Sequence, residues 1–143
     1  LTIECWAKTD LAGQANNWLV NRVYSGGIDT GYRLGVVGGK PCFEVPQTDW
    51  SHHLIADDAM PTGRWVHLAG TFDGAVMRLY VDGEQVATMD RPGPVKPNSF
   101  KVTLGSYEAG HQAFFTGLLD EVKLYSRTLS AEEIASHYRA LAQ

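Results

Sequence analysis

The alternation of apolar and polar residues is clearest between Arg64 and Met89, where it predicts three antiparallel β-strands. Two Asp-Gly pairs, Asp73-Gly74 and Asp82-Gly83, interrupt runs rich in Val, Leu, Tyr and Phe. An Asp-Gly pair between such runs is a strong hairpin signal, because tight hairpin turns need positive φ. The second strand has one wholly apolar face, which we expect to look into a core and which consists of Met77, Leu79 and Val81.

Shorter strands are expected on both sides of this meander. The segments whose patterns indicate strands are Leu1 to Lys8, Trp18 to Tyr24, Tyr32 to Val37, Pro41 to Val45, Phe100 to Ser106 and Gly117 to Tyr125. A connection with three prolines, from Arg91 to Asn98, is consistent with a crossing from one sheet to the other. We therefore predict an all-β fold, a two-sheet antiparallel jelly-roll sandwich.

The chain is expected to end in a short helix, from about Ala131 to Ala140. Ser130 followed by Glu133 is a capping box, and Leu129 with Ile134 is a hydrophobic staple. This helix must dock on a sheet, because its apolar residues fall on one face.

Length and charge narrow the function classes. The 143 residues fit a single domain spanning positions 1–143. A net charge of −4 and the lack of a Lys/Arg cluster argue against binding nucleic acid or anionic lipid, and no apolar run is long enough for membrane insertion. Cys5 and Cys42 are compatible either with one disulfide or with two reduced thiols.

Three stretches together resemble the laminin-G-like, concanavalin-A-like lectin/glucanase jelly-roll domains, distant relatives of the pentraxins. They are LTIECWAKT, RWVHLAGTFDGAVMRLYVDGEQV and TGLLDEVKLYSRTLSAEEIASHY. The resemblance implies an additional strand upstream of Leu1, so the domain is expected to be N-terminally incomplete. It also implies an extracellular or periplasmic, secreted module of a larger protein, which favours an oxidising compartment for the two cysteines.

Catalysis is disfavoured by missing motifs. Glycoside hydrolases of this fold carry a Glu-x-Asp-x-x-Glu-like cluster on one strand, and no strand here has one. Asp120 and Glu121 are adjacent, so their side chains are expected to point to opposite faces. No histidines have the spacing of a chelating pair, and His52 and His53 would diverge in extended structure. We therefore expect a protein that is not an enzyme, with a glycosidase remnant as the least favoured alternative.

Aromatic residues in loops are better candidates for a functional site. Sugar binding needs flat apolar faces beside a few polar groups, and that mixture occurs in two loops. The candidate carbohydrate-binding residues are Trp50, His52, Tyr107 and His111. The alternative is that loop aromatics such as Trp50, Phe114 and Phe115 cap the ends of the core. Trp6, Trp18 and Trp65 lie in strand patterns and are expected to pack in the core or between the sheets.

Calcium is the cofactor we consider. Alternation in the last strand places Asp120 on the same face as the core-forming Leu118, Val122 and Leu124, where an acid needs compensation by backbone donors, a basic partner or a cation. Calcium takes carboxylate oxygens in flexible geometry. The resemblance to pentraxins adds the loops holding Asp29 and Glu108 as a second candidate site.

The sequence therefore predicts a non-catalytic binding module whose partner is a glycan. The alternative is a protein-interaction or structural adhesion module that binds a protein surface. An exposed aromatic platform beside hydrogen-bonding side chains would favour the glycan, and a broad apolar patch would favour the protein.

Overall fold

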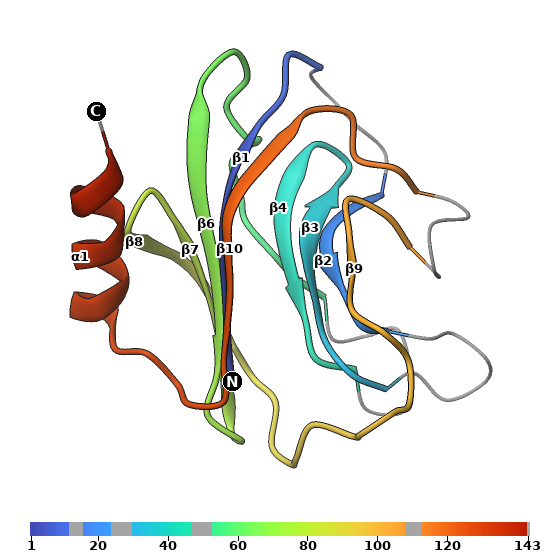
Figure 1. Ribbon diagram of the computed structural model, residues 1–143. Coiled ribbons are helices and arrows are strands. Elements are labelled where there is room, and N and C mark those ends of the chain that lie inside the picture. Colours follow the sequence, from blue (N-terminus) through green and yellow to red (C-terminus); the bar gives the residue numbers. More distant parts are fainter. Residues whose placement is uncertain (12–15, 24–29, 47–52, 108–112, 143) are drawn as a thin grey trace.

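The computed structural model describes residues 1–11, 16–23, 30–46, 53–107 and 113–142. Within these ranges, two antiparallel five-stranded sheets pack face to face (Figure 1). Sheet A contains, in spatial order, β10 (Leu118–Tyr125), β1 (Thr2–Lys8), β6 (Trp65–Phe72), β7 (Val76–Val81) and β8 (Glu84–Asp90). Sheet B contains β5 (His53–Ile55), β4 (Lys40–Glu44), β3 (Arg33–Val37), β2 (Asn17–Asn21) and β9 (Thr103–Leu104). The predicted all-β jelly-roll sandwich is confirmed.

The β6-β7-β8 meander forms as its hairpin signals predict. Asp82 and Gly83 have φ values of 50° and 82°, and Gly74 has a φ of 99°. The two left-handed residues between β7 and β8 match the twist of the flanking strands. The segment from Arg91 to Asn98 then carries the chain from β8 in sheet A to β9 in sheet B, as predicted. Strand β9 has only two residues and is shorter than expected.

The core lies between the inner faces of the two sheets. Inward-facing side chains of both sheets form this core. Those at most 3% exposed include Ile3, Leu68 and Leu79 from sheet A and Leu34, Phe43 and Leu54 from sheet B. Burying each such side chain contributes about 1.5–3 kcal/mol. The outer faces of both sheets are therefore left for other contacts.

Gly70 allows the two sheets to approach closely. A Cβ atom added to Gly70 in β6 would lie 2.3 Å from the ring of Phe43 in β4 of the opposite sheet. Only a residue without a side chain leaves room for this ring, which is fully buried. The contact fixes the distance between the sheets near their centre.

Arg91 ties the crossing segment to the end of β4. Its guanidinium is fully buried, and Nε donates to the carbonyl of Val45 and Nη2 to that of Pro46, each at 2.7 Å. Nη1 donates to the carbonyls of Gly93 and Pro94 at 2.8 and 3.0 Å. A buried charge is tolerated only with such hydrogen bonds. One side chain therefore connects the end of sheet A with the end of sheet B.

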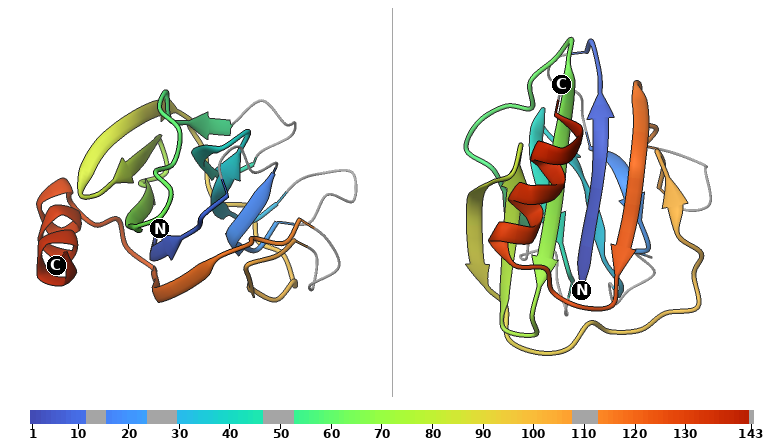
Figure 2. Two further views of the ribbon diagram at one scale, coloured as in Figure 1. Left: turned by 90° about the horizontal axis from the view of Figure 1, so that it is seen from above. Right: turned by 60° about the vertical axis from the view of Figure 1, so that its left-hand side comes forward.

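The terminal helix α1 (Ala131–Leu141) covers the outer face of sheet A (Figure 2). Ser130 and Glu133 form the predicted capping box, with the Ser130 hydroxyl accepting from the Glu133 amide at 3.2 Å. Leu129 and Ile134 are both buried and pack with Ala69 and Tyr80 of the sheet, which confirms the staple. Within the described part of the chain, no helix has the length and hydrophobicity needed to cross a membrane.

A β-bulge in β10 reverses the expected orientation of Asp120. The register between β1 and β10 shifts at this point, and Glu121 has a φ of 49°. Leu119 and Val122 consequently pack against the core, whereas Asp120 is exposed. The prediction that Asp120 points with the core aliphatics is wrong, because the bulge inserts one extra residue into the alternation. The residues expected beside it, Leu118 and Leu124, are 58% and 41% exposed.

The two cysteines are free thiols that lie in different parts of the sandwich. Cys5 belongs to the core between the sheets, whereas Cys42 packs with Trp18 and Tyr107 on the outer face of sheet B. The open question of a disulfide is answered in favour of two reduced thiols. Whether a further strand precedes Leu1, as the resemblance implies, stays a prediction.

Gly70→Ala should destabilise the fold by about 1–3 kcal/mol, because the new methyl group overlaps the Phe43 ring. Urea unfolding followed by tryptophan fluorescence measures the loss. Phe43→Leu makes room, so the double variant should cost clearly less than the sum of the two single variants. Strictly additive costs would mean that the two residues do not limit each other.

Ser130→Ala should lower the free energy of unfolding by about 0.5–2 kcal/mol, because the helix loses its N-cap. Ser126→Ala is the matched control, since Ser126 is exposed and lies outside the helix. Thermal melting of both variants tests the cap, and equal melting temperatures for Ser130→Ala and wild type would contradict it.

Candidate functional site

Most residues proposed from the sequence lie outside the described part of the chain. This holds for the carbohydrate-binding candidates Trp50, His52 and His111 and for the calcium candidates Asp29 and Glu108. Two candidates are described, Tyr107 and Asp120, and they lie on opposite sheets. The structure therefore does not bring these two residues together.

Tyr107 packs against the outer face of sheet B. Its side chain contacts Trp18 and Cys42, its ring centroid lies 5.8 Å from the guanidinium carbon of Arg33, and only 9% of the residue is exposed. Trp18 lies closer to Arg33, at 3.8 Å. The two aromatic rings thus enclose a buried cation rather than form an open platform.

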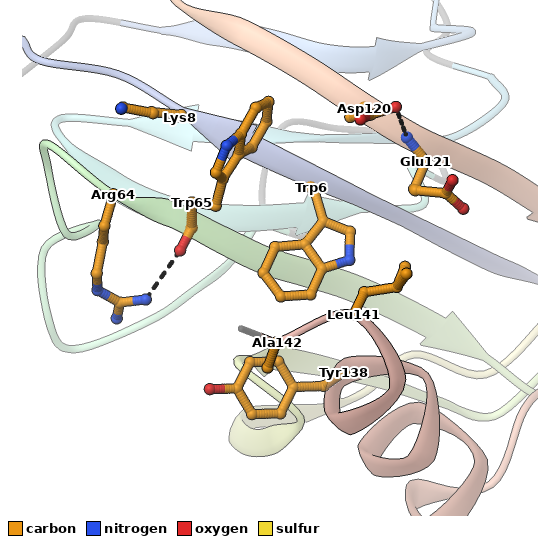
Figure 3. Close-up of a pocket in the computed structure, with 9 residues that line it drawn as sticks. All are labelled: Trp6, Lys8, Arg64, Trp65, Asp120, Glu121, Tyr138, Leu141 and Ala142. Atoms are coloured by element: carbon orange, nitrogen blue, oxygen red, sulfur yellow. Dashed lines mark hydrogen bonds between the residues drawn. The ribbon is translucent and has the colours of Figure 1, made fainter.

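Asp120 lies at the rim of a pocket between the outer face of sheet A and the C-terminal turn of α1 (Figure 3). The pocket has a volume of about 650 Å³. Its lining comes from β1, β6, β10 and α1 and consists of Trp6, Lys8, Arg64, Trp65, Asp120, Glu121, Tyr138, Leu141 and Ala142. Five of these nine residues are aromatic or aliphatic, and the other four are charged.

The aromatic floor of the pocket forms because β1 and α1 meet there. Trp6 of β1 stacks on Tyr138 of α1, with ring centroids 5.7 Å apart and an interplanar angle of 20°. Trp65 lies beside them at the first position of β6 and is 38% exposed, whereas His67 and Ala69, on the same outer face, are buried. The prediction that Trp65 packs in the core is wrong. Trp65 lies at the sheet's end, where burial is incomplete.

Charged groups lie on both sides of these rings. Lys8 and Arg64 flank Trp65, whereas Asp120 and Glu121 lie on the other side of Trp6 (Figure 3). Arg64 is held in place, because Nη1 donates to the Trp65 carbonyl at 3.0 Å and Nη2 lies 2.7 Å from a carboxylate oxygen of Asp82. An accessible aromatic face with donors on one side and acceptors on the other suits a polyhydroxylated ring.

Sequence reasoning missed this pocket, although part of its signal was visible. Trp65 opens a strand directly after Gly63 and Arg64, a position where a strand side chain lies at the edge of a sheet. Tyr138 follows Ile134 at helical spacing and therefore faces the same sheet. That the helix ends over Trp6 could not be read from the sequence.

The exposure of Asp120 removes the reason for expecting a cation beside it. Its carboxylate is exposed, and Oδ1 accepts a hydrogen bond from the Glu121 amide at 2.8 Å. The neighbouring Glu121 forms an ion pair with Lys123 at 2.7 Å. Because this carboxylate is exposed to water, its charge needs no bound cation, and calcium binding at Asp120 now rests on the resemblance alone.

A buried carboxylate holds α1 against the sheet next to the pocket. Glu4 of β1 is 1% exposed, and its oxygens lie 3.0 Å from Nδ1 of His137, 3.0 Å from the hydroxyl of Tyr125 and 3.6 Å from Nε2 of His67. Burial by itself raises the pKa of Glu4, but the hydrogen bonds from His67, His137 and Tyr125 outweigh it and lower the pKa to about 2. Glu4 is therefore ionised in the folded protein at neutral pH.

Comparison with known proteins agrees with the observed fold. The family model of the concanavalin A-like lectin/glucanases superfamily matches residues 1–135. The chain belongs to this superfamily. A curated relative from mouse, pappalysin-1, is 34% identical over 98 residues, which are 63% of this chain and 6% of that protein. The chain thus corresponds to a small part of this relative.

Two solved structures share the sandwich fold. The CBM40 domain of Ruminococcus gnavus IT-sialidase, bound to α2,3-sialyllactose, has a TM-score of 0.74 and 23% identity and covers 96% of this chain and 81% of that one. Domain 4 of an extracellular arabinanase from Geobacillus stearothermophilus, in complex with arabinotriose, has a TM-score of 0.70 and 18% identity, with coverages of 94% and 64%. At these identities, the likeness establishes the fold.

Glu4→Gln should reduce the fall in the free energy of unfolding at low pH. The pKa of Glu4 falls from 4.5 to about 2 on folding. Its contribution is therefore fully present above pH 4.5 and is lost as the pH falls towards 2. Over this range wild type should lose of the order of 3 kcal/mol that the variant does not lose. Urea unfolding at pH 7, 4 and 2.5 measures both curves.

Glu132→Gln is the matched control, because Glu132 is an exposed acid in the first turn of the same helix. It should leave the acid profile as in wild type. Parallel curves for wild type and Glu4→Gln would show that Glu4 carries no folding-linked proton.

Proposed function

We propose that the chain is a non-catalytic carbohydrate-binding module and that the pocket between α1 and sheet A is its glycan site. The observation that carries the proposal is the exposed indole of Trp65 beside the stacked Trp6 and Tyr138, with charged side chains on both sides. This is the combination of an aromatic platform and hydrogen-bonding groups that favours a sugar over a protein surface. The two glycan-bound neighbours support it, since each shows a sandwich of this fold holding an oligosaccharide.

The pocket's acids support binding rather than hydrolysis. A glycosidase needs one carboxyl group whose pKa is raised by apolar surroundings and a second one opposite to it. Asp120 and Glu121 are both exposed neighbours on one strand. The fold also occurs in glycoside hydrolases, so the argument rests on these side chains and not on the architecture.

The module belongs, in this proposal, to a larger secreted or surface protein. The match to 6% of mouse pappalysin-1 supports this view, because there the corresponding segment is one part of a much longer chain. A weak single site is useful in such a setting, since several modules raise the overall affinity by effective concentration.

A protein-interaction module is the alternative, and one surface favours it. Phe100, Val102 and Leu104 are 43%, 40% and 55% exposed along the β9 edge of sheet B. A row of exposed apolar side chains on a sheet edge is typical of a surface that another chain covers. This surface lies on the other sheet from the pocket between α1 and sheet A, which we call the Trp65 pocket. Variants can therefore separate the two functions.

Calcium stays a prediction. Melting the domain with calcium and with a chelator tests it, because a metal that binds only the folded state raises the melting temperature. Equal melting temperatures would leave Asp120 an ordinary exposed acid. A shift that persists in Asp120→Asn would move the ion to another site.

Trp65→Ala should weaken glycan binding by about tenfold or more, equivalent to about 1.4 kcal/mol, because the stacking face is lost. A glycan array identifies the ligand, and calorimetry with that ligand measures the affinity of each variant. Since Trp65 is partly exposed, the variant should keep a cooperative unfolding transition.

Phe100→Ala is the control, as it removes an exposed aromatic ring from the other sheet. It should leave glycan affinity unchanged. If Trp65→Ala binds the glycan as wild type does, the pocket is not the site; if no glycan binds and Phe100→Ala abolishes capture of a protein partner, the alternative holds.

A further inference from the structure

Strands β4 and β5 bring three metal-ligand side chains together on the outer face of sheet B. Cys42 and Glu44 are two residues apart in β4 and therefore share a face. His53 of β5 stands directly opposite Glu44 in the antiparallel register. The intervening Phe43 points into the core, so this arrangement follows from the packing of the sandwich.

The three side chains converge on a single point. Cys42 Sγ lies 3.6 Å from Oε1 of Glu44, and His53 Nδ1 contacts the same oxygen. All three ligand atoms lie within 4.8 Å of one another. The other carboxylate oxygen, Oε2, accepts a hydrogen bond from Arg33 Nε at 2.5 Å. One oxygen of Glu44 is thus fixed by Arg33, while the other faces a sulfur and a nitrogen.

We propose that Cys42, Glu44 and His53 form a binding site for a zinc-type divalent cation. Thiolate, imidazole and carboxylate are the ligands that zinc takes at about 2.0–2.3 Å. Donor atoms around one such ion stand roughly 3–4 Å apart, and the Cys42–Glu44 separation of 3.6 Å fits that spacing. His53 Nδ1 stands closer to Glu44 and has to move back to admit the ion. Calcium and magnesium are disfavoured, because they take oxygen ligands and avoid sulfur.

The surroundings supply the support that metal sites need. Arg33 orients Glu44 and is itself held under the ring of Trp18 at 3.8 Å. Such an outer partner fixes the direction of a ligating carboxylate. Cys42 and Glu44 are buried, whereas the His53 side chain is 29% exposed, so the ion would approach from the His53 side, and water would supply the fourth ligand. One thiolate and one carboxylate offset the two charges of the ion, and the guanidinium of Arg33 leaves the cluster with one net positive charge.

Binding requires one proton to leave. The thiol of Cys42 gives up its proton to water and becomes the ligand. The proton that His53 holds on Nδ1 against Glu44 has to pass to Nε2 through solvent, so that Nδ1 can bind the ion. Burial raises the pKa of the Cys42 thiol, and the negative charge of Glu44 adds to this effect. The ion replaces the proton as the positive partner of sulfur, so no oxidant or other reactant is needed.

Sequence reasoning overlooked the site because it compared histidines only with each other. The signal was present in part, since Cys42 and Glu44 alternate correctly for one face of a strand. The partner His53 comes from a different strand, and only the pairing of β4 with β5 makes it a neighbour. The site lies on the opposite sheet from the Trp65 pocket and does not depend on the proposed glycan function.

Cobalt(II) substitution and zinc-dependent melting test the site on the reduced chain. Cobalt should give a thiolate-to-metal charge-transfer band together with the intense visible bands of four-coordinate geometry, and zinc should remove both by competition. Zinc should also raise the melting temperature, because the site exists only in the folded state. Cys42→Ala should lose the charge-transfer band and the zinc-induced shift.

Cys5→Ala is the matched control, since Cys5 is the other buried thiol and lies in the core between the sheets. It should keep both signals. If Cys42→Ala fails to fold, His53→Ala serves in its place, because His53 is partly exposed, and it should weaken zinc binding at least about tenfold. Wild type without a charge-transfer band overturns the proposal, as does a zinc shift that survives in Cys42→Ala and His53→Ala.

Discussion

The contact between the Phe43 ring and the backbone of Gly70 sets the geometry on which the rest of the structure depends. It brings β4 of sheet B against β6 of sheet A at a separation that no larger residue than glycine allows. Because side chains alternate along a strand, fixing Phe43 inward also fixes Cys42 and Glu44 outward. In the same way, Gly70 facing inward places its neighbours Ala69 and Thr71 on the outer face.

The two outer faces then develop different chemistry. On sheet A, α1 covers the outer residues of β1 and β6, and Glu4 is buried among two histidines and a tyrosine. On sheet B, Arg33 and Glu44 form a buried pair between aromatic rings. Buried carboxylates are stable only with such partners, so each cluster also determines what packs above it. The pocket that contains Trp65 and the cluster of Cys42, Glu44 and His53 are consequences of this division.

The Trp65 pocket exists because the helix stops before the sheet does. Trp6 is closed over by Tyr138, whereas Trp65, at the first position of β6, stays 38% exposed. Charged side chains that would be costly inside the sandwich lie at this rim with access to water. An apolar ring surface with polar neighbours is thus produced at the boundary of helix packing, without any special motif in the sequence.

The sequence by itself determined the fold class, the meander, the crossing segment and the capped terminal helix. These features depend on neighbours along the chain, such as Asp82 with Gly83 or Ser130 with Glu133, whose interactions are local. Tertiary structure decided the orientation of Asp120, because one bulge residue, Glu121, reverses an alternation that otherwise reads correctly. It also decided the exposure of Trp65 and the proximity of Cys42 to His53, because both depend on which element lies alongside. The local periodicity of a sequence does not specify which strands pair or where a helix docks.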